Sequence, residues 1–226
     1  MKNNTWKLVV LLGTLMIAAA GMLCLYNIQQ NNDAEAYSEA ILEALKSRIP
    51  EPPPESVPEP AETAPDPAKE DLFAYYEDNA DAPVESETAE IVIGNAAYCG
   101  YLTLPSLRLE LPVMSRWSYP NLKLAPCRYS GSAQTNDLII MAHNYSSHFG
   151  RIGELTTGSQ FSFTDTNGIA HPYTVSFIEV IEGQDVEQMF SGQSVDWDLT
   201  LSTCTLSGQS RVTIRADRLD KPEEES

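Results

Sequence analysis

The stretch from Trp197 to Ala216 constrains the fold more than any other part of the chain, because two short alternating strands follow each other across a single turn. Every second position is apolar, at Leu199 and Leu201 in the first strand and at Val212, Ile214 and Ala216 in the second. Such alternation is typical of strands that bury one face. Ser207-Gly208 between them suits a two-residue hairpin turn. We therefore expect a β-hairpin with one face in the core.

A turn at Ser207-Gly208 fixes which residues face each other, because paired residue numbers then sum to 415. In this register the apolar residues share one face, and a one-residue slip would destroy that agreement. The predicted polar pairs are Cys204 with Arg211, Ser202 with Thr213, and Thr200 with Arg215. Opposed Cβ atoms lie about 5 Å apart, so the Arg211 guanidinium reaches the Cys204 thiol. Arg215 lies about 13 Å along the strand, and we expect Arg215→Lys to be nearly silent.

A second segment supplies a histidine. Residues Asp137–Met141 form an apolar strand pattern that soon ends in His143-Asn144-Tyr145. A histidine at the mouth of a buried strand suits the general base or acid that cysteine catalysis requires. His148, in the polar loop beyond, is the rival base. The alternative for Cys204 is a small buried hydrophobic residue without a chemical role.

Together these residues resemble the sortases, membrane-anchored cysteine transpeptidases of Gram-positive cell surfaces. The resemblance is carried by LSTC at 201–204 with an arginine seven positions later, and by HNY at 143–145 followed by HFGRIGEL at 148–155. It includes YLTLPSLRLELPV at 101–113 and covers about residues 95–218. It implies an all-β fold, a closed sortase-type eight-stranded β-barrel with a few short helices.

For activity, the resemblance implies acyl transfer through a thioacyl-enzyme. Cys204 attacks a peptide bond in the sorting signal of a secreted protein, His143 acts as general acid and base, and Arg211 donates hydrogen bonds to the developing oxyanion. The acyl group then passes to an amine of a cell-wall precursor or a pilin. Thr203 and Asn144 are the expected substrate-binding residues.

Two features depart from the family pattern. Ala142 precedes the His-Asn pair, where the family commonly has glycine, and the segment between Ile181 and Trp197 is too short for the long helix that class B sortases insert there. The sortase class and the sorting motif therefore stay open. Two other functions also stay open: a cysteine peptidase that only hydrolyses, and a surface-binding module in which Cys204 is structural.

The folded catalytic domain is expected from residue 90 to residue 220. Strand patterns recur in it at 98–104, 108–113, 137–141, 160–164, 173–181, 198–203 and 211–215, and short helical patterns at 120–124, 149–155 and 186–190. Many short strands separated by turn signals are typical of an all-β barrel or sandwich. A domain of roughly 130 residues can build one modest core.

Residues 1–28 are expected to be a cytoplasmic stub and a transmembrane anchor. An apolar run from Leu8 to about Tyr26 follows two lysines and is long enough to cross a bilayer. The alternative is a signal peptide cleaved at Ala18-Ala19-Ala20, but the apolar run continues past that site. The lysines place the rest of the chain outside the cytoplasm. We expect a single-pass protein of the cell membrane with an extracytoplasmic catalytic domain.

Residues 29–89 are expected to be an acidic, proline-rich stalk. Nine of the 15 prolines fall between residues 50 and 83, and residues 29–90 carry a net charge of −14 out of −18 for the chain. Such a composition favours a disordered, extended spacer. A short helix at 32–48 is the alternative for the start of the stalk, with Tyr37, Ile41, Leu42 and Leu45 on one stripe. The acidic balance and the lack of a basic patch argue against nucleic-acid binding. An acidic tail follows at 221–226.

The remaining cysteines and acidic residues point to no cofactor. Cys99 and Cys127 either form a disulfide or stay separate buried thiols, and we favour separate thiols. The histidines and cysteines match no metal-ligand spacing, so no metal is expected. A weaker alternative is a calcium site among the acidic residues that end or follow the 173–181 strand, namely Glu179, Glu182, Asp185 and Glu187.

Overall fold

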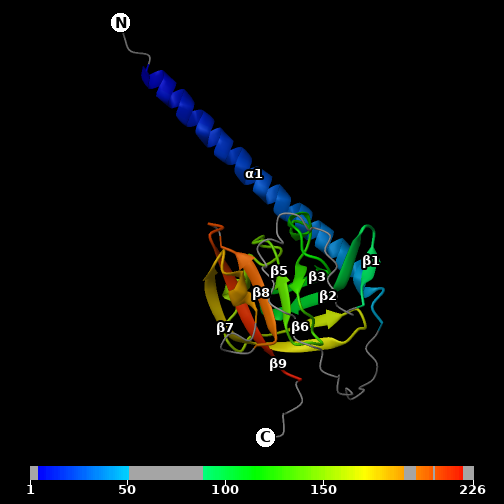
Figure 1. Cartoon of the computed structure of the whole chain (residues 1–226). Coiled ribbons are helices and arrows are strands. Elements are labelled where there is room, and N and C mark those ends of the chain that lie inside the picture. The colour runs from blue at the N-terminus through cyan, green and yellow to red at the C-terminus, as the bar shows by residue number, and fades with distance from the viewer. Residues whose placement is uncertain (1–4, 51–88, 191–196, 206, 221–226) are drawn as a thin grey trace.

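The computed structural model describes residues 5–50, 89–190, 197–205 and 207–220 of the 226-residue chain. Most of the predicted stalk and the whole acidic tail lie outside the described residues, so both stay predictions. The described part is a β-barrel with one long helix, α1 (Thr5–Lys46), whose C-terminal end lies against it (Figure 1).

The described residues contain nine strands, and eight of them close a barrel. The strands are β1 (Ile91–Ile93), β2 (Ala96–Leu104), β3 (Leu109–Met114), β4 (Cys127–Ser130), β5 (Leu138–Met141), β6 (Gln160–Asp165), β7 (Ala170–Glu182), β8 (Leu199–Cys204) and β9 (Ser210–Arg218). Neighbours follow the order β1-β2-β3-β4-β5-β8-β9-β7-β6, and β2 also pairs with β6, which joins the sheet to itself. β1 lies outside the ring as a partner of β2. The predicted closed eight-stranded barrel is confirmed.

Alternating apolar side chains fill the barrel. The apolar positions predicted for β8 and β9 are buried in one cluster with residues of β5, β2 and β6, among them Leu199, Leu201, Ile214, Ala216, Ile140, Leu102 and Phe163. The opposite face of β8 and β9 is polar, as expected, yet it is buried as well, at Thr200, Ser202, Thr213 and Arg215. Buried polar groups usually have hydrogen-bond partners. The Thr213 hydroxyl donates to the Glu179 carbonyl over 3.1 Å, the partners of Thr200 and Arg215 are described with the site, and Ser202 Oγ has no partner among the described residues.

The short helices are single turns between strands. They are η1 (Pro105–Leu107), α2 (Tyr119–Leu122), η2 (Ile152–Glu154) and η3 (Val186–Met189). The last three match the predicted helical patterns, whereas η1, β1 and β4 were not predicted. The side chain of Ser118 caps α2 by accepting a hydrogen bond from the backbone N–H of Asn121, over 3.2 Å.

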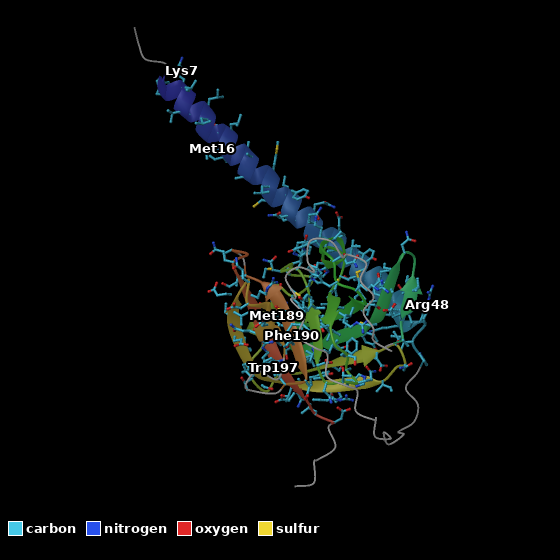
Figure 2. The ribbon with its side chains drawn as sticks, in the orientation of Figure 1. Lys7, Met16, Arg48, Met189, Phe190 and Trp197 are labelled. Carbon is cyan, nitrogen blue, oxygen red and sulfur yellow. The ribbon has the colours of Figure 1, made fainter. Side chains whose placement is uncertain are left out.

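The helix α1 has two unlike halves. It spans 42 residues, which corresponds to a length of about 63 Å. Its N-terminal half extends beyond the barrel, with Lys7 and Met16 far from the strands (Figure 2), and it is the one described helix long and apolar enough to cross a membrane. Its C-terminal half, residues 30–46, packs on the outside of the barrel and is called the docked half of α1 below.

The docked half of α1 shares a core cluster with the barrel. Leu45 is fully buried in this cluster beside Tyr98 and Cys127, and Ile41 packs against it. The Tyr37 and Tyr98 hydroxyls are 2.7 Å apart. The short helix predicted at 32–48 is therefore the end of a continuous helix, and its apolar stripe does have a partner.

Both ends of the undescribed segment 51–88 lie at one turn, between β6 and β7. The Thr166 hydroxyl donates a 2.7 Å hydrogen bond to the carbonyl of Ala89. Gly168 has a φ of +83°, and a Cβ there would collide with the carbonyl oxygen of Pro50. Pro50 and Ala89, the two described residues that flank this segment, therefore lie beside the same turn.

Candidate active site

The β8–β9 hairpin places Cys204 opposite Arg211. The pairing register of the two strands runs from Leu199 with Ala216 to Cys204 with Arg211, which confirms the predicted sum of 415. Arg211 Nη1 lies 3.8 Å from Cys204 Sγ, and Arg211 Nε donates to the Gly183 carbonyl over 3.3 Å. The carbonyl thus helps to hold the guanidinium beside a partly exposed thiol.

The β5–β8 ladder brings His143 to the same place. These strands are parallel, and each β8 residue number exceeds that of its β5 partner by 61, up to Met141 with Ser202. The next residue continues the pattern, since the Ala142 N–H donates to the Ser202 carbonyl over 3.1 Å. β5 ends at Met141, and the same offset carried two residues further would pair His143 with Cys204. Because adjacent strands lie about 4.8 Å apart and paired residues share a face, we expect the imidazole to lie near the thiol.

The two expected substrate-binding residues lie on either side of this alignment. The buried Thr203 hydroxyl donates a 2.9 Å hydrogen bond to the Ala142 carbonyl, so it ties the cysteine strand to the histidine segment. Asn144 follows His143 in the loop and is half-buried. Ala142, where glycine was expected from the resemblance, is not among the residues with positive φ, so its methyl group causes no backbone strain.

The two candidate bases differ in environment. Burial, with a smaller contribution from the positive charge of Lys123, lowers the pKa of His143, which stays partly exposed. Burial lowers the pKa of His148 further, to about 4. His148 is fully buried, and its Nε2 lies 3.3 Å from the Ser38 hydroxyl of α1. Exposure and alignment therefore favour His143 over His148 as the acid and base.

Arg215 belongs to a buried network and not to the thiol site. It is fully buried, opposite Thr200 and four residues from Arg211. Its guanidinium donates to the Glu179 carboxylate over 2.7 Å and to the Met189 carbonyl over 3.0 Å, and it lies 4.3 Å from the centroid of the Trp197 ring. Figure 2 labels Met189 and Trp197 beside β8.

The expectation that Arg215→Lys would be nearly silent is therefore wrong with respect to stability. The Arg215 guanidinium also donates to the Gln188 carbonyl and to the Thr200 hydroxyl, so it fastens η3 to the polar face of the hairpin. A lysine ammonium cannot reproduce the planar fork of five donors. The polar face is buried because η3 and the end of β7 cover it, which the strand pattern alone did not indicate.

The other cysteines and the acidic cluster differ from the Cys204 site. Cys99 and Cys127 are free, as predicted, and burial raises the pKa of both thiols. Neither is therefore a ready nucleophile. Glu179 is engaged by Arg215, and the described residues contain no group of three or more His, Cys, Asp or Glu side chains placed to hold a metal ion.

Comparison with known proteins identifies the family. The sequence profile of the sortase domain matches residues 102–219, just over half of the 226-residue chain. The chain belongs to the sortase family. As a sortase, it is a cysteine transpeptidase with a β-barrel fold.

Solved sortases share this fold at low sequence identity. Sortase C1 from Streptococcus agalactiae is 21% identical, with a TM-score of 0.50 over 60% of this chain and 74% of that chain. Sortase A from Corynebacterium diphtheriae is 18% identical, with a TM-score of 0.50 over 57% and 64% of the two chains. Sortase C from Clostridium perfringens is 24% identical, with a TM-score of 0.47 over 55% and 71%. A search of curated proteins gave no match.

Sequence reasoning missed the surroundings of the sortase site. It did not find that Ser38 and Asn31 of α1 contact the loop after His143, nor that Lys123 lies close enough to affect that histidine. These groups come from distant parts of the chain. The one available signal was the apolar stripe at 37–45, which shows that the helix packs on something but not where.

Proposed function

We propose that this sortase cleaves the sorting signal of secreted proteins with Cys204, His143 and Arg211, and transfers the acyl group to an amine. The observation that carries the proposal is the register of β5, β8 and β9, in which Arg211 Nη1 lies 3.8 Å from Cys204 Sγ and β5 ends beside Ser202, two residues before His143. A nucleophile, a proton carrier and a fixed donor are the groups that acyl transfer through cysteine requires.

The chemistry proceeds in two steps. The Cys204 thiolate attacks the scissile carbonyl, the Arg211 guanidinium donates hydrogen bonds to the resulting oxyanion, and the His143 imidazolium gives its proton to the departing amine as the C–N bond breaks. The thioester that remains is attacked by a second amine, and neutral His143 takes the proton of that amine. The new amide forms, and the Cys204 sulfur leaves as the thiolate.

The lowered pKa of His143 affects both steps. At neutral pH the imidazole is mostly neutral, so it is ready to deprotonate the incoming amine, and only a minor fraction carries the proton that the leaving amine needs. Arg211 is the cation held beside the sulfur, with its Nη1 3.8 Å from Cys204 Sγ.

We further propose that the N-terminal half of α1 anchors the enzyme in the membrane, with the barrel on the extracytoplasmic side. The apolar length of the helix supports the anchor, and the lysines before it support the orientation. The sorting-signal peptide and the cell-wall or pilin amine are the proposed partners, and Thr203 and Asn144 are the proposed residues beside the bound peptide.

The test is product analysis with the full-length protein in detergent micelles. It is incubated with a panel of sorting-signal peptides, with and without triglycine as the amine. We expect an amide product that requires triglycine, together with a thioacyl adduct mapped to Cys204. Cys204→Ala should abolish both, whereas Cys24→Ala, which removes an exposed thiol in the helix, should change neither.

Two outcomes would contradict this proposal. Only the free-acid product, whatever the amine concentration, would show a hydrolytic peptidase. No cleavage of any peptide, together with a Cys204 thiol that is indifferent to thiol-directed reagents, would indicate a binding module with a structural cysteine.

A further inference from the structure

Three rings connect His143 to the helix α1. The His143 and Tyr145 rings are stacked, with centroids 4.9 Å apart and an interplanar angle of 24°. Tyr145 in turn contacts His148, with centroids 5.6 Å apart. The imidazole aligned with Cys204 is therefore in contact, through Tyr145, with a fully buried residue. We refer to His143, Tyr145 and His148 as the ring stack.

The docked half of α1 fixes the far end of the ring stack. The Ser38 hydroxyl is buried, 3.3 Å from His148 Nε2, and it donates to the Leu124 carbonyl over 3.2 Å. A serine hydroxyl has one proton. With this proton directed to Leu124, the Ser38 oxygen is left as an acceptor that suits a His148 tautomer protonated at Nε2. The pKa of His148, about 4, keeps this ring neutral at physiological pH.

A second contact holds the same loop to the helix. The Asn31 side-chain oxygen accepts hydrogen bonds from the Ser146 hydroxyl over 3.0 Å and from the Ser147 backbone N–H over 3.3 Å. Within the loop, the Phe149 N–H donates to the His143 carbonyl over 3.2 Å. The loop after His143 is therefore hydrogen-bonded to the His143 carbonyl through Phe149. Its middle is hydrogen-bonded to Asn31 of α1, which precedes Ser38 by seven residues.

We propose that Tyr145 and His148 are positioning residues for His143, and that α1 holds them in place through Ser38 and Asn31. The anchor helix is then part of the support of the catalytic site as well as a tether. This inference rests on the proposed catalytic role of His143. A misplacement of a reacting group by about 1 Å can cost roughly 100-fold in rate, so an imidazole that carries protons in both steps benefits from a fixed ring plane.

The test compares four variants of the full-length enzyme in micelles. Tyr145→Leu removes a ring from the stack, Tyr145→Phe keeps it, and Ser38→Ala removes the partner of His148. Ser47→Ala is the matched control, because the Ser47 hydroxyl is exposed and bonds only within its own helix turn, to the Ala44 carbonyl. The measurements are kcat and KM for acyl transfer, the pKa of His143 by NMR of ¹³C-labelled histidine, and the melting temperature.

We expect Tyr145→Leu to lower kcat by roughly 10- to 100-fold and Ser38→Ala by about 3- to 10-fold, with KM little changed. In Tyr145→Leu the pKa of His143 should rise, because water reaches the ring. Tyr145→Phe should retain most of the activity, and Ser47→Ala should behave as the wild type.

A loss of melting temperature in Tyr145→Leu and Ser38→Ala, with kcat and the His143 titration unchanged, would overturn the positioning role and leave only a structural one. The proposed function fails separately, if His143→Ala itself keeps full transfer activity. The NMR titration of His143 does not depend on turnover. It therefore tests the effect of Tyr145 on the His143 ring whether or not His143 is catalytic.

Discussion

Arg211 and Arg215 carry the same guanidinium on the same face of one strand, yet their surroundings assign them different tasks. Arg211 is half-buried beside the Cys204 sulfur, whereas Arg215 is fully buried among carbonyls, a carboxylate and an indole ring. Side-chain alternation in the sequence places both arginines on the polar face. Only the three-dimensional surroundings of that face distinguish Arg211, for which we propose a catalytic role, from the structural Arg215.

The first prediction concerns this pair. Arg211→Lys should lower acyl transfer by about 100-fold or more, because an ammonium does not present two parallel N–H donors to an oxyanion. Its melting temperature should stay close to that of the wild type. Arg215→Lys should show the opposite pattern, with a loss of about 1–3 kcal/mol in unfolding free energy, because the shorter list of ammonium donors leaves buried acceptors such as the Gln188 and Met189 carbonyls without a partner.

Both arginine variants are assayed together for acyl transfer at 20 °C and for thermal unfolding. An inactive but stable Arg215→Lys, with an active Arg211→Lys, would place the oxyanion donor four residues along β9 from the position proposed here.

The second prediction concerns the pH dependence of the rate. Because burial and Lys123 lower the pKa of His143, the acidic limb of kcat/KM should have its midpoint below 6.5, the ordinary value for histidine. Lys123→Ala removes a positive charge, so the pKa of His143 and the acidic limb should both move upward. Lys123 is exposed, so the shift should be a few tenths of a unit and should shrink at high salt.

Lys123→Arg keeps the charge and is the control, with a pH profile like that of the wild type. A shift of the acidic limb in the opposite direction in Lys123→Ala would show that another group titrates in that limb.

At the level of elements, most of the barrel could be predicted, because its strands alternate clearly. The β8–β9 register followed from a single turn and a hydrophobic pattern, and it brought Cys204 to Arg211. The three-residue β1 and the β4 segment CRYS are too short to show a period, so both were missed. The alignment of His143 with Cys204 depends on a parallel ladder between strands far apart in sequence, which local patterns do not encode.

Among the elements, the docking of α1 on the barrel is the largest difference between the structure and the prediction from sequence. The sequence shows an apolar run and then a weaker stripe, and proline-rich composition after it favoured a spacer. The sequence predicts only a short separate helix for the apolar stripe at 37–45, because no sequence pattern identifies the surface on which the stripe packs. In the structure that partner is the barrel wall at Tyr98 and Cys127, and the helix continues without a break from the apolar run.

The third prediction tests that docking. Leu45 is fully buried against the barrel, so Leu45→Ala should lower the unfolding free energy by about 2–4 kcal/mol, the usual cost of truncating a buried leucine. Leu25→Ala, on the exposed half of the same helix, should have little effect. Urea unfolding in micelles, followed by tryptophan fluorescence, measures both. Equal midpoints for the two variants would mean that α1 is not part of the cooperative fold.

At the level of the whole molecule, the proposed membrane anchor and the docked half of α1 belong to one continuous helix. The apolar run ends near Tyr26, and Asn31 accepts hydrogen bonds from the loop after His143. Five helical residues correspond to about 8 Å. With the anchoring proposed above, we expect the site to lie close to the membrane surface.

The fourth prediction is that the mature protein remains an integral membrane protein with its N-terminal helix uncleaved. It should stay in the membrane fraction after carbonate washing and give N-terminal peptides from residues before Ala18. The physical reason is the apolar helix, which continues past the small-residue site without interruption. Soluble protein that begins near Gly21 would contradict this.

The fifth prediction concerns residues 51–88. Removal of residues 55–80 should change the unfolding free energy by less than about 1 kcal/mol, because the cost of loop closure depends only on the logarithm of loop length. Thermal unfolding of the deletion variant beside the full-length protein measures this. A drop of many degrees would mean that the removed residues pack on the barrel.

The turn at Thr166–Gly168, beside which both Pro50 and Ala89 lie, has an evolutionary consequence. Because the two described residues that flank the segment lie at one turn, we expect its codons to tolerate duplication, loss or replacement without a change in the pairing of the strands. Selection on length is therefore weak there and strong in α1, where one inserted residue would rotate the docked face by about 100°. Homologous genes should differ in size mainly between these two anchor points.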